Sequence, residues 1–123
     1  MNNLNILYIE DDLEILENVS FLLGRYVKEV FTATNGEEAL KIYKEKKPDI
    51  VVSDINIPRI DGLKVAEIIR EDAPNIPIVI ISAHHEDYQL QRAKELNVST
   101  YLRKPFTLAE LKDAMSEVIS SLE

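Results

Sequence analysis

Five short apolar segments alternate with five amphipathic segments along the chain, and this alternation restricts the fold more than any other feature of the sequence. The strand-like segments cover residues 5–9, 27–33, 50–53, 76–81 and 100–103, and each is followed by apolar residues at helical spacing. Residues 50–53 and 76–81 are apolar at nearly every position, which is typical of strands buried on both faces. We therefore expect an α/β fold of the doubly wound class, with a five-stranded parallel sheet and helices on both faces.

Residues that can cap a helix stand ahead of several amphipathic segments. Thr34 and Thr107 are each followed three residues later by a glutamate, which is the spacing of a capping box. Asp11 has the same spacing to Glu14, and either Asp11 or Asp12 could cap the first helix. These residues predict where three of the helices begin.

The composition suits one domain, residues 1–123, with a single core. The formal net charge of −8 disfavours direct binding of nucleic acid or of an anionic membrane, because both would be repelled. No segment is apolar for long enough to cross a bilayer, so we expect no membrane association and a cytoplasmic protein. The absence of cysteine excludes disulfides, thiolate catalysis and cysteine zinc sites.

Candidate site residues follow four of the five predicted strands. Glu10 and Asp11 follow the first strand, Asp54 the third, Ser82 the fourth and Lys104 the fifth. The carboxyl ends of parallel strands lie at one edge of a doubly wound sheet, where ligands bind. We therefore expect these side chains to meet at one site.

Each of these residues also has a simpler interpretation when it is taken alone. Capping of the first helix could by itself explain Asp11, and Asp54 could be a turn residue. Ser82 could bond within its own loop, Lys104 could be a solvated side chain, and Tyr101 could be a half-buried strand aromatic. The functional interpretation depends on their occurring together.

Clustered acids need a compensating cation. Two carboxylates about 4 Å apart repel by about 1 kcal/mol in water and by about 4 kcal/mol at an effective dielectric near 20. Mg²⁺ removes this repulsion and typically takes one or two carboxylates together with waters and phosphate oxygens. With Lys104 and the Ser82 hydroxyl available to bind an anion, the sequence predicts that Asp54 attacks a phosphoryl group.

Over nearly its whole length the chain resembles the receiver domain of two-component response regulators. The shared motifs, in the family's order, are Glu10-Asp11 after the first strand, Asp54 with Pro58, Asp61 and Gly62, Ser82-Ala83 after the fourth strand, and Lys104-Pro105-Phe106 after the fifth. The resemblance implies the flavodoxin-like strand order 2-1-3-4-5. It also implies a phosphoacceptor signalling domain rather than an enzyme.

The resemblance assigns the chemistry to particular residues. Asp54 would accept a phosphoryl group from the phosphohistidine of a histidine kinase or a phosphotransfer protein. Mg²⁺ would be bound by Asp11, by Asp54 and by the backbone carbonyl of Asn56, with Glu10 acting through water. Lys104 would contact the phosphoryl group, and its bond to Pro105 would be cis, as is typical of the family.

The resemblance also implies a switch and an output. Ser82, Ala83 and Tyr101 would respond to the phosphoryl group and change the surface formed by the fourth helix, fifth strand and fifth helix. Asn56 and His84 occupy the positions that tune the lifetime of the phosphorylated form. The partners implied are an output domain or an effector protein, or a second copy in a phosphorylation-dependent homodimer.

Two alternatives remain open at this point. A phosphatase with an aspartate nucleophile would need a second acid two residues after Asp54, where this chain has Asn56. A receiver-like module could bind partners without being phosphorylated, although every position needed for phosphorylation is filled.

A flavin-binding protein of the same fold is disfavoured because residues 10–12 are acidic and would repel a phosphate. A zinc site at His84, His85 and Glu86 is less economical than an exposed helix start.

Overall fold

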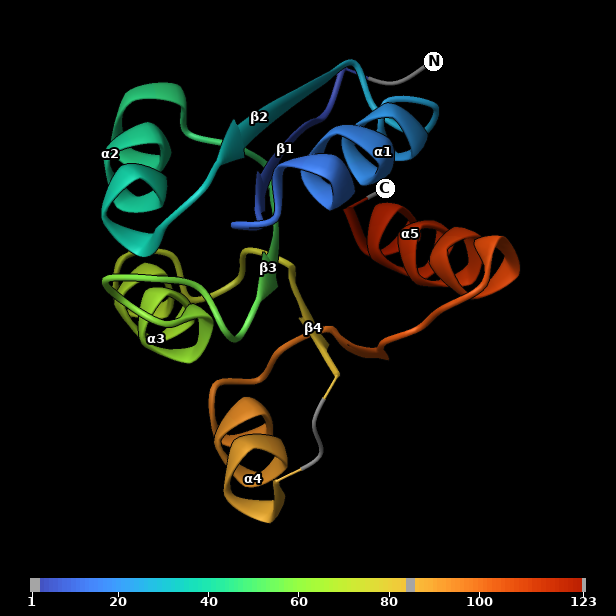
Figure 1. Ribbon diagram of the computed structural model, residues 1–123. Coiled ribbons are helices and arrows are strands. Elements are labelled where there is room, and N and C mark those ends of the chain that lie inside the picture. Colours follow the sequence, from blue (N-terminus) through green and yellow to red (C-terminus); the bar gives the residue numbers. More distant parts are fainter. Residues whose placement is uncertain (1–2, 84–85, 123) are drawn as a thin grey trace.

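All five strands of the sheet run parallel, in the order β2-β1-β3-β4-β5 (Figure 1). The computed structural model describes residues 3–83 and 86–122. The elements are β1 (Asn5–Ile9), α1 (Leu13–Leu23), β2 (Glu29–Ala33), α2 (Gly36–Lys46), β3 (Ile50–Asp54), α3 (Gly62–Asp72), β4 (Ile78–Ser82), α4 (Asp87–Glu95), β5 (Thr100–Arg103) and α5 (Leu108–Leu122). The predicted fold class and strand order are confirmed.

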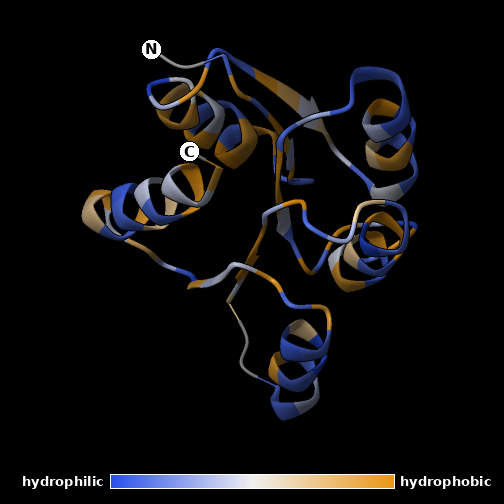
Figure 2. Cartoon of the chain, turned by 180° about the vertical axis from the view of Figure 1, so that it is seen from behind, coloured by the Kyte–Doolittle hydropathy of each residue, from blue (hydrophilic) through white to orange (hydrophobic). Residues whose placement is uncertain are grey.

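Helices cover both faces of the sheet, with α1 and α5 on one side and α2, α3 and α4 on the other (Figure 1). Alternate residues of each strand point to opposite faces. In β1, Ile6 and Tyr8 pack in the core beneath α1 and α5, whereas Leu7 and Ile9 pack in the core on the other face. Figure 2 shows largely apolar strands between helices that carry both hydrophobic and hydrophilic residues.

The strand register brings the carboxyl ends of four strands level with one another. Ile9 pairs with Ser53, and Asp54 pairs with Ile81. Ser82 pairs with Arg103, so Lys104 follows directly beside the end of β4. Residues that stand far apart in the sequence therefore meet at one edge of the sheet.

Two predicted strands begin later than the sequence pattern indicated. The second strand begins at Glu29 rather than at Val27, and the fourth begins at Ile78 rather than at Ile76. Val27 is fully buried in a loop, and Ile76 is partly buried ahead of Pro77. Burial alone does not distinguish a strand residue from a loop residue that fills the core.

The capping prediction is right for α5, is decided in favour of Asp12 over Asp11 for α1, and is displaced by one residue for α2. Thr107 and Glu110 form the predicted reciprocal box at the start of α5. At α2 the box is formed by Asn35 and Glu38: the Glu38 N–H donates to Asn35 Oδ1, and Glu38 Oε1 accepts from the Thr34 N–H. At α1 the cap is Asp12, whose Oδ1 accepts from the Ile15 N–H.

Helix α4 differs from the others in what it buries. The sequence pattern predicted that Tyr88, Leu90, Ala93 and Leu96 form the inward stripe of this helix. Ala93 and Leu96 are buried as predicted, but Tyr88 and Leu90 are 67% and 36% exposed. The third buried residue is Gln89, which completes the spacing i, i+4 and i+7. Its N-cap, Glu86, makes no side-chain capping bond. Within the described residues, none of the helices is long and apolar enough to cross a membrane.

Candidate functional site

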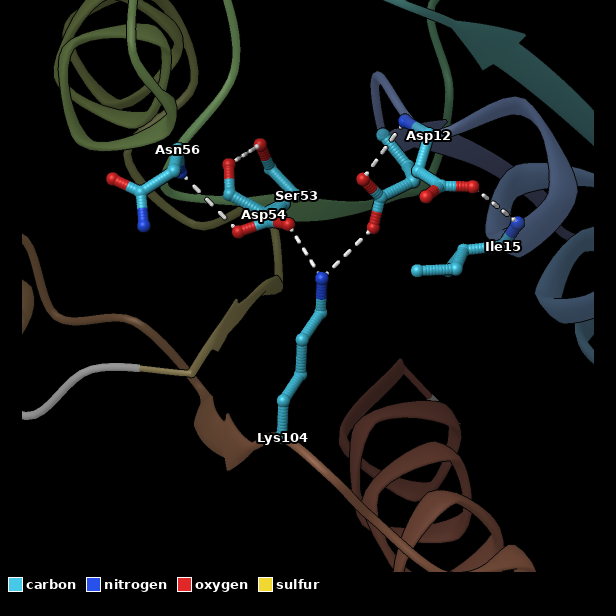
Figure 3. Close-up of polar contacts among 7 residues, drawn as sticks. Asp12, Ile15, Ser53, Asp54, Asn56 and Lys104 are labelled. Carbon is cyan, nitrogen blue, oxygen red and sulfur yellow. Dashed lines mark hydrogen bonds and ion pairs between the residues drawn. The ribbon is translucent and has the colours of Figure 1, made fainter.

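One ammonium group joins two carboxylates at the carboxyl edge of the sheet (Figure 3). Lys104 Nζ lies 2.6 Å from Asp54 Oδ2 and 3.0 Å from Glu10 Oε1. Glu10 follows β1, Asp54 ends β3 and Lys104 follows β5. The structure thus brings together three of the predicted site residues.

Asp54 is presented by a buried strand and held by its own loop. Every residue of β3 is buried, and Asp54 itself is 6% exposed. Its Oδ1 accepts a 3.2 Å hydrogen bond from the Asn56 N–H, and its backbone carbonyl accepts one of 2.8 Å from Ser53 Oγ. Because Lys104 binds the other carboxylate oxygen, both oxygens are oriented.

Glu10 is the more buried of the two acids, with 2% of its surface exposed. Its Oε2 accepts a 3.2 Å hydrogen bond from the Asp12 N–H. Burial raises the pKa of the Glu10 carboxyl, against the lowering effect of the hydrogen bonds from Lys104 and Asp12. Asp12 caps α1, so the exposed Asp11 is not needed for that role.

Lys104 is held as a cation at this edge. Burial lowers the pKa of the Lys104 ammonium, but the hydrogen bonds to Asp54 and Glu10 outweigh burial, and the pKa lies above its ordinary value of 10.5. The Lys104 backbone N–H donates to the Ser82 carbonyl at 2.9 Å. The predicted cis peptide bond between Lys104 and Pro105 is present.

The donors at this edge fit a hard divalent cation. Glu10 and Asp54 carry two negative charges against the single charge of Lys104, and the oxygens of Asp11 and Asn56 lie on the adjoining residues. Carboxylate and carbonyl oxygens are the ligands that Mg²⁺ prefers. Among residues 3–83 and 86–122, however, no three acidic or histidine side chains are grouped closely enough to hold a metal ion. The two acids in direct contact with Lys104 are Glu10 and Asp54.

The structure describes all of the remaining predicted residues except His84. Ser82 is fully buried at the end of β4, Ala83 is exposed after it, and Tyr101 is half-buried in β5. Asn56 is exposed in the loop after β3. His84 lies outside the described residues, as does His85 of the zinc alternative, so the structure does not test either assignment.

Two features of the site were not predicted from the sequence. Tyr8 is buried in β1, and its pKa is raised by burial and by the charges of Glu10 and Asp54. Beside Lys104 lies an apolar hollow of about 430 Å³, lined by Ile15, Ala83, Lys104, Pro105 and Phe106. Ile15 of α1 and the loop after β5 are far apart in the sequence and come together only through the folding of the sheet.

The model of the response regulator receiver domain family matches residues 6–116. The chain belongs to this family. Receiver domains are the phosphoaccepting modules of two-component response regulators and act in signal transduction rather than as enzymes. The family typically uses Mg²⁺, and its members work with histidine kinases or phosphotransfer proteins.

Among curated proteins, this receiver is 31% identical over 121 residues to the alkaline phosphatase synthesis transcriptional regulatory protein PhoP of Bacillus subtilis, covering 98% of the chain and 50% of that protein. It is 31% identical over 119 residues to sporulation initiation phosphotransferase F of the same organism, covering 97% and 96%. The receiver thus spans half the length of the first relative and nearly the whole of the second. A crystal structure of a response regulator receiver domain protein from Clostridium thermocellum matches with a TM-score of 0.89 at 30% identity, covering 97% of this chain and 96% of that one.

Proposed function

We propose that Asp54 is the residue of this receiver that accepts the phosphoryl group. The observation that carries the proposal is the 2.6 Å contact between Lys104 Nζ and Asp54 Oδ2, on a carboxylate that is 6% exposed at the end of the central strand. An oriented carboxylate beside a fixed positive charge is arranged to attack a phosphoryl group and to neutralise the charge that it brings.

The transfer requires little covalent chemistry from the protein. An oxygen of Asp54 forms the new P–O bond while the P–N bond of the partner's phosphohistidine breaks. The histidine nitrogen keeps the electron pair of the broken bond and takes up a proton from solvent. The Lys104 ammonium moves its hydrogen bond from the Asp54 carboxylate to a phosphoryl oxygen and remains paired with Glu10.

We assign the Mg²⁺ site to Asp11, Asp54 and the backbone carbonyl of Asn56, with Glu10 acting through water. The oxygen donors and the uncompensated negative charge at this edge support the assignment. When bound, Mg²⁺ would supply positive charge against the phosphoryl oxygens. The burial of Glu10 and Asp54 would make that charge more effective than it is in bulk water.

The proposed output follows from the position of the switch residues. Ser82 ends β4 and Tyr101 lies in β5, so both can transmit a change at Asp54 to the surface formed by α4, β5 and α5. We propose that this surface engages an output domain, an effector protein or a second copy of the chain.

Intact-mass measurement after treatment with acetyl phosphate tests the proposal. The wild-type chain should gain one phosphoryl group with Mg²⁺ present, and Asp54→Asn should gain none. Asp113→Asn is the matched control, because Asp113 is an exposed aspartate on α5. Uptake by Asp54→Asn at the wild-type rate would exclude Asp54, and no uptake by any form would favour a receiver-like module that acts without phosphorylation.

A further inference from the structure

The loop between β3 and α3, residues 55–61, rests on the first turn of α2, an element that contributes no side chain to the proposed site. The Gly36 N–H donates a 3.2 Å hydrogen bond to the Pro58 carbonyl. Arg59 Nη1 lies 3.3 Å from Glu37 Oε2. Two consecutive residues of α2 therefore contact two consecutive residues of the loop that carries Asn56.

The approach of Gly36 to the loop is too close for any other residue. A Cβ atom at position 36 would overlap the backbone carbonyl oxygen of Ile60 and would lie 2.7 Å from the Ile60 Cβ. Ile60 is itself packed against the core and has little freedom to retreat. Gly36 is required here by contact with the loop rather than by its own backbone angles.

The other side of the loop is equally tight. A Cβ at Gly62 would overlap the carbonyl oxygen of Asp54, and the Gly62 N–H donates to the Ile55 carbonyl at 2.8 Å. Displacement of the loop by α2 therefore transmits to the segment that contains Asp54 and Asn56. The close backbone contacts at Gly36 and Gly62 leave the loop little room to move.

Arg59 indicates that the loop conformation is imposed on it. Its φ of 71° lies in the left-handed region, which a residue with a side chain seldom occupies and which costs on the order of 1 kcal/mol or more. Its side chain is 65% exposed, so core packing does not compensate. The contacts with Gly36 and Glu37 hold this part of the loop together with the 2.9 Å bond from the Ile60 N–H to the Pro58 carbonyl.

We propose that the first turn of α2 positions the Asp54 loop, and that Gly36 is a positioning residue for the Asn56 carbonyl. The inference rests on the proposed function, because it assigns to α2 the placement of one proposed Mg²⁺ ligand. Gly36 touches neither the metal nor the phosphoryl group and acts through Pro58 and Ile60. Moving the Asn56 carbonyl should weaken Mg²⁺ binding, because Mg²⁺ demands nearly ideal octahedral geometry.

Calorimetric titration with Mg²⁺ alone tests the inference on Gly36→Ala. We expect the dissociation constant to rise about tenfold, the lower end of the effect of removing support from a metal ligand. Gly24→Ala is the matched control, since its Cβ would meet neighbouring atoms at 3.4 Å or more, and it should bind as the wild type does. Saturating Mg²⁺ should restore phosphoryl uptake by Gly36→Ala, which a general loss of structure would not allow.

The outcomes separate the two proposals. If the wild type is phosphorylated on Asp54 while Gly36→Ala binds Mg²⁺ with unchanged affinity, the role of α2 is wrong and the proposed function stands. If Gly36→Ala loses its thermal transition, Glu37→Gln decides, because it weakens the contact with Arg59 and leaves the residues of the loop unchanged. That variant should bind Mg²⁺ about two- to fivefold more weakly, and wild-type affinity would overturn the inference.

Discussion

Lys104 Nζ lies 2.6 Å from Asp54 Oδ2, although fifty positions separate the two residues in the chain. Two parallel strand pairings create this contact, because β4 pairs with β3 on one side and with β5 on the other. The same ammonium reaches Glu10, at the end of β1. The site is therefore a product of the sheet order and exists only when β1, β3, β4 and β5 are in register.

Replacement of Lys104 by methionine should slow phosphoryl uptake more than it harms folding. The change leaves Glu10 and Asp54 facing each other without their shared cation, which we expect to cost about 1–3 kcal/mol of unfolding free energy. Adding Glu10→Gln should restore most of that stability but not the uptake rate. Urea denaturation and intact-mass kinetics measure the two effects. Loss of the thermal transition in the Lys104→Met single variant would contradict the prediction.

Tyr8 should make the protein less stable in alkali. Burial and the nearby acids raise the pKa of folded Tyr8 above its ordinary value of 10.0, so the folded state retains a proton that the unfolded state loses. Stability is therefore full below pH 10 and falls as the pH rises further, by up to about 1.4 kcal/mol per pH unit. Lys104, whose pKa is also raised, adds to the fall above pH 10.5.

The Tyr8→Phe variant isolates the first contribution. Its unfolding free energy should decline less steeply than that of the wild type between pH 10 and 11, because phenylalanine has no proton to lose. Equal slopes for the two proteins in urea titrations would show that Tyr8 is not the group responsible.

Arg70 should be more important for stability than any exposed arginine. Its guanidinium donates to backbone carbonyls of the loops before β4 and β5, those of Leu96, Ala73, Pro74, Ile76 and Asn97. Loss of a charged group that satisfies several carbonyls should cost about 1.5–3 kcal/mol in Arg70→Met. Arg92→Met, which removes only ion pairs with Glu67 and Glu95, is the control and should change the urea midpoint little.

The cap of α2 tests the correction to the sequence pattern. Asn35→Ala should lower the unfolding free energy by about 1 kcal/mol, because Asn35 Oδ1 accepts from the Glu38 N–H. Thr34→Ala should have a smaller effect, since Thr34 takes part through its backbone N–H alone. If the two substitutions exchanged their effects, the capping box that the sequence predicts from Thr34 and Glu37 would be correct.

Much of the fold was predictable because the strands are short and apolar and the residues after them are polar. The run from Ile50 to Ser53 predicted both a buried strand and the placement of Asp54, and the register of β3 with β1 and β4 confirms the strand. Helix α4 was predicted less well. Its inward position 89 carries a glutamine, whereas the apolar side chains of Tyr88 and Leu90 face outward. An apolar stripe is a poor guide where the buried face is partly polar.

The sequence predicted which residues form the site better than it predicted the contacts between them. The sequence placed Glu10, Asp54 and Lys104 at one edge, but it did not indicate that Lys104 would bridge both acids. Nor could it show that Gly36 and Pro58 would meet, because that contact depends on the approach of α2 to the loop after β3. Pairwise geometry between distant segments is decided by packing, which no local pattern contains.

The most direct test of the account is to locate the phosphoryl group chemically. An aspartyl phosphate is reduced by borohydride to homoserine, which marks the modified position in a peptide map. After treatment with acetyl phosphate and Mg²⁺, we predict homoserine at position 54 alone. Homoserine at another acidic position, with none at 54, would contradict the assignment of Asp54.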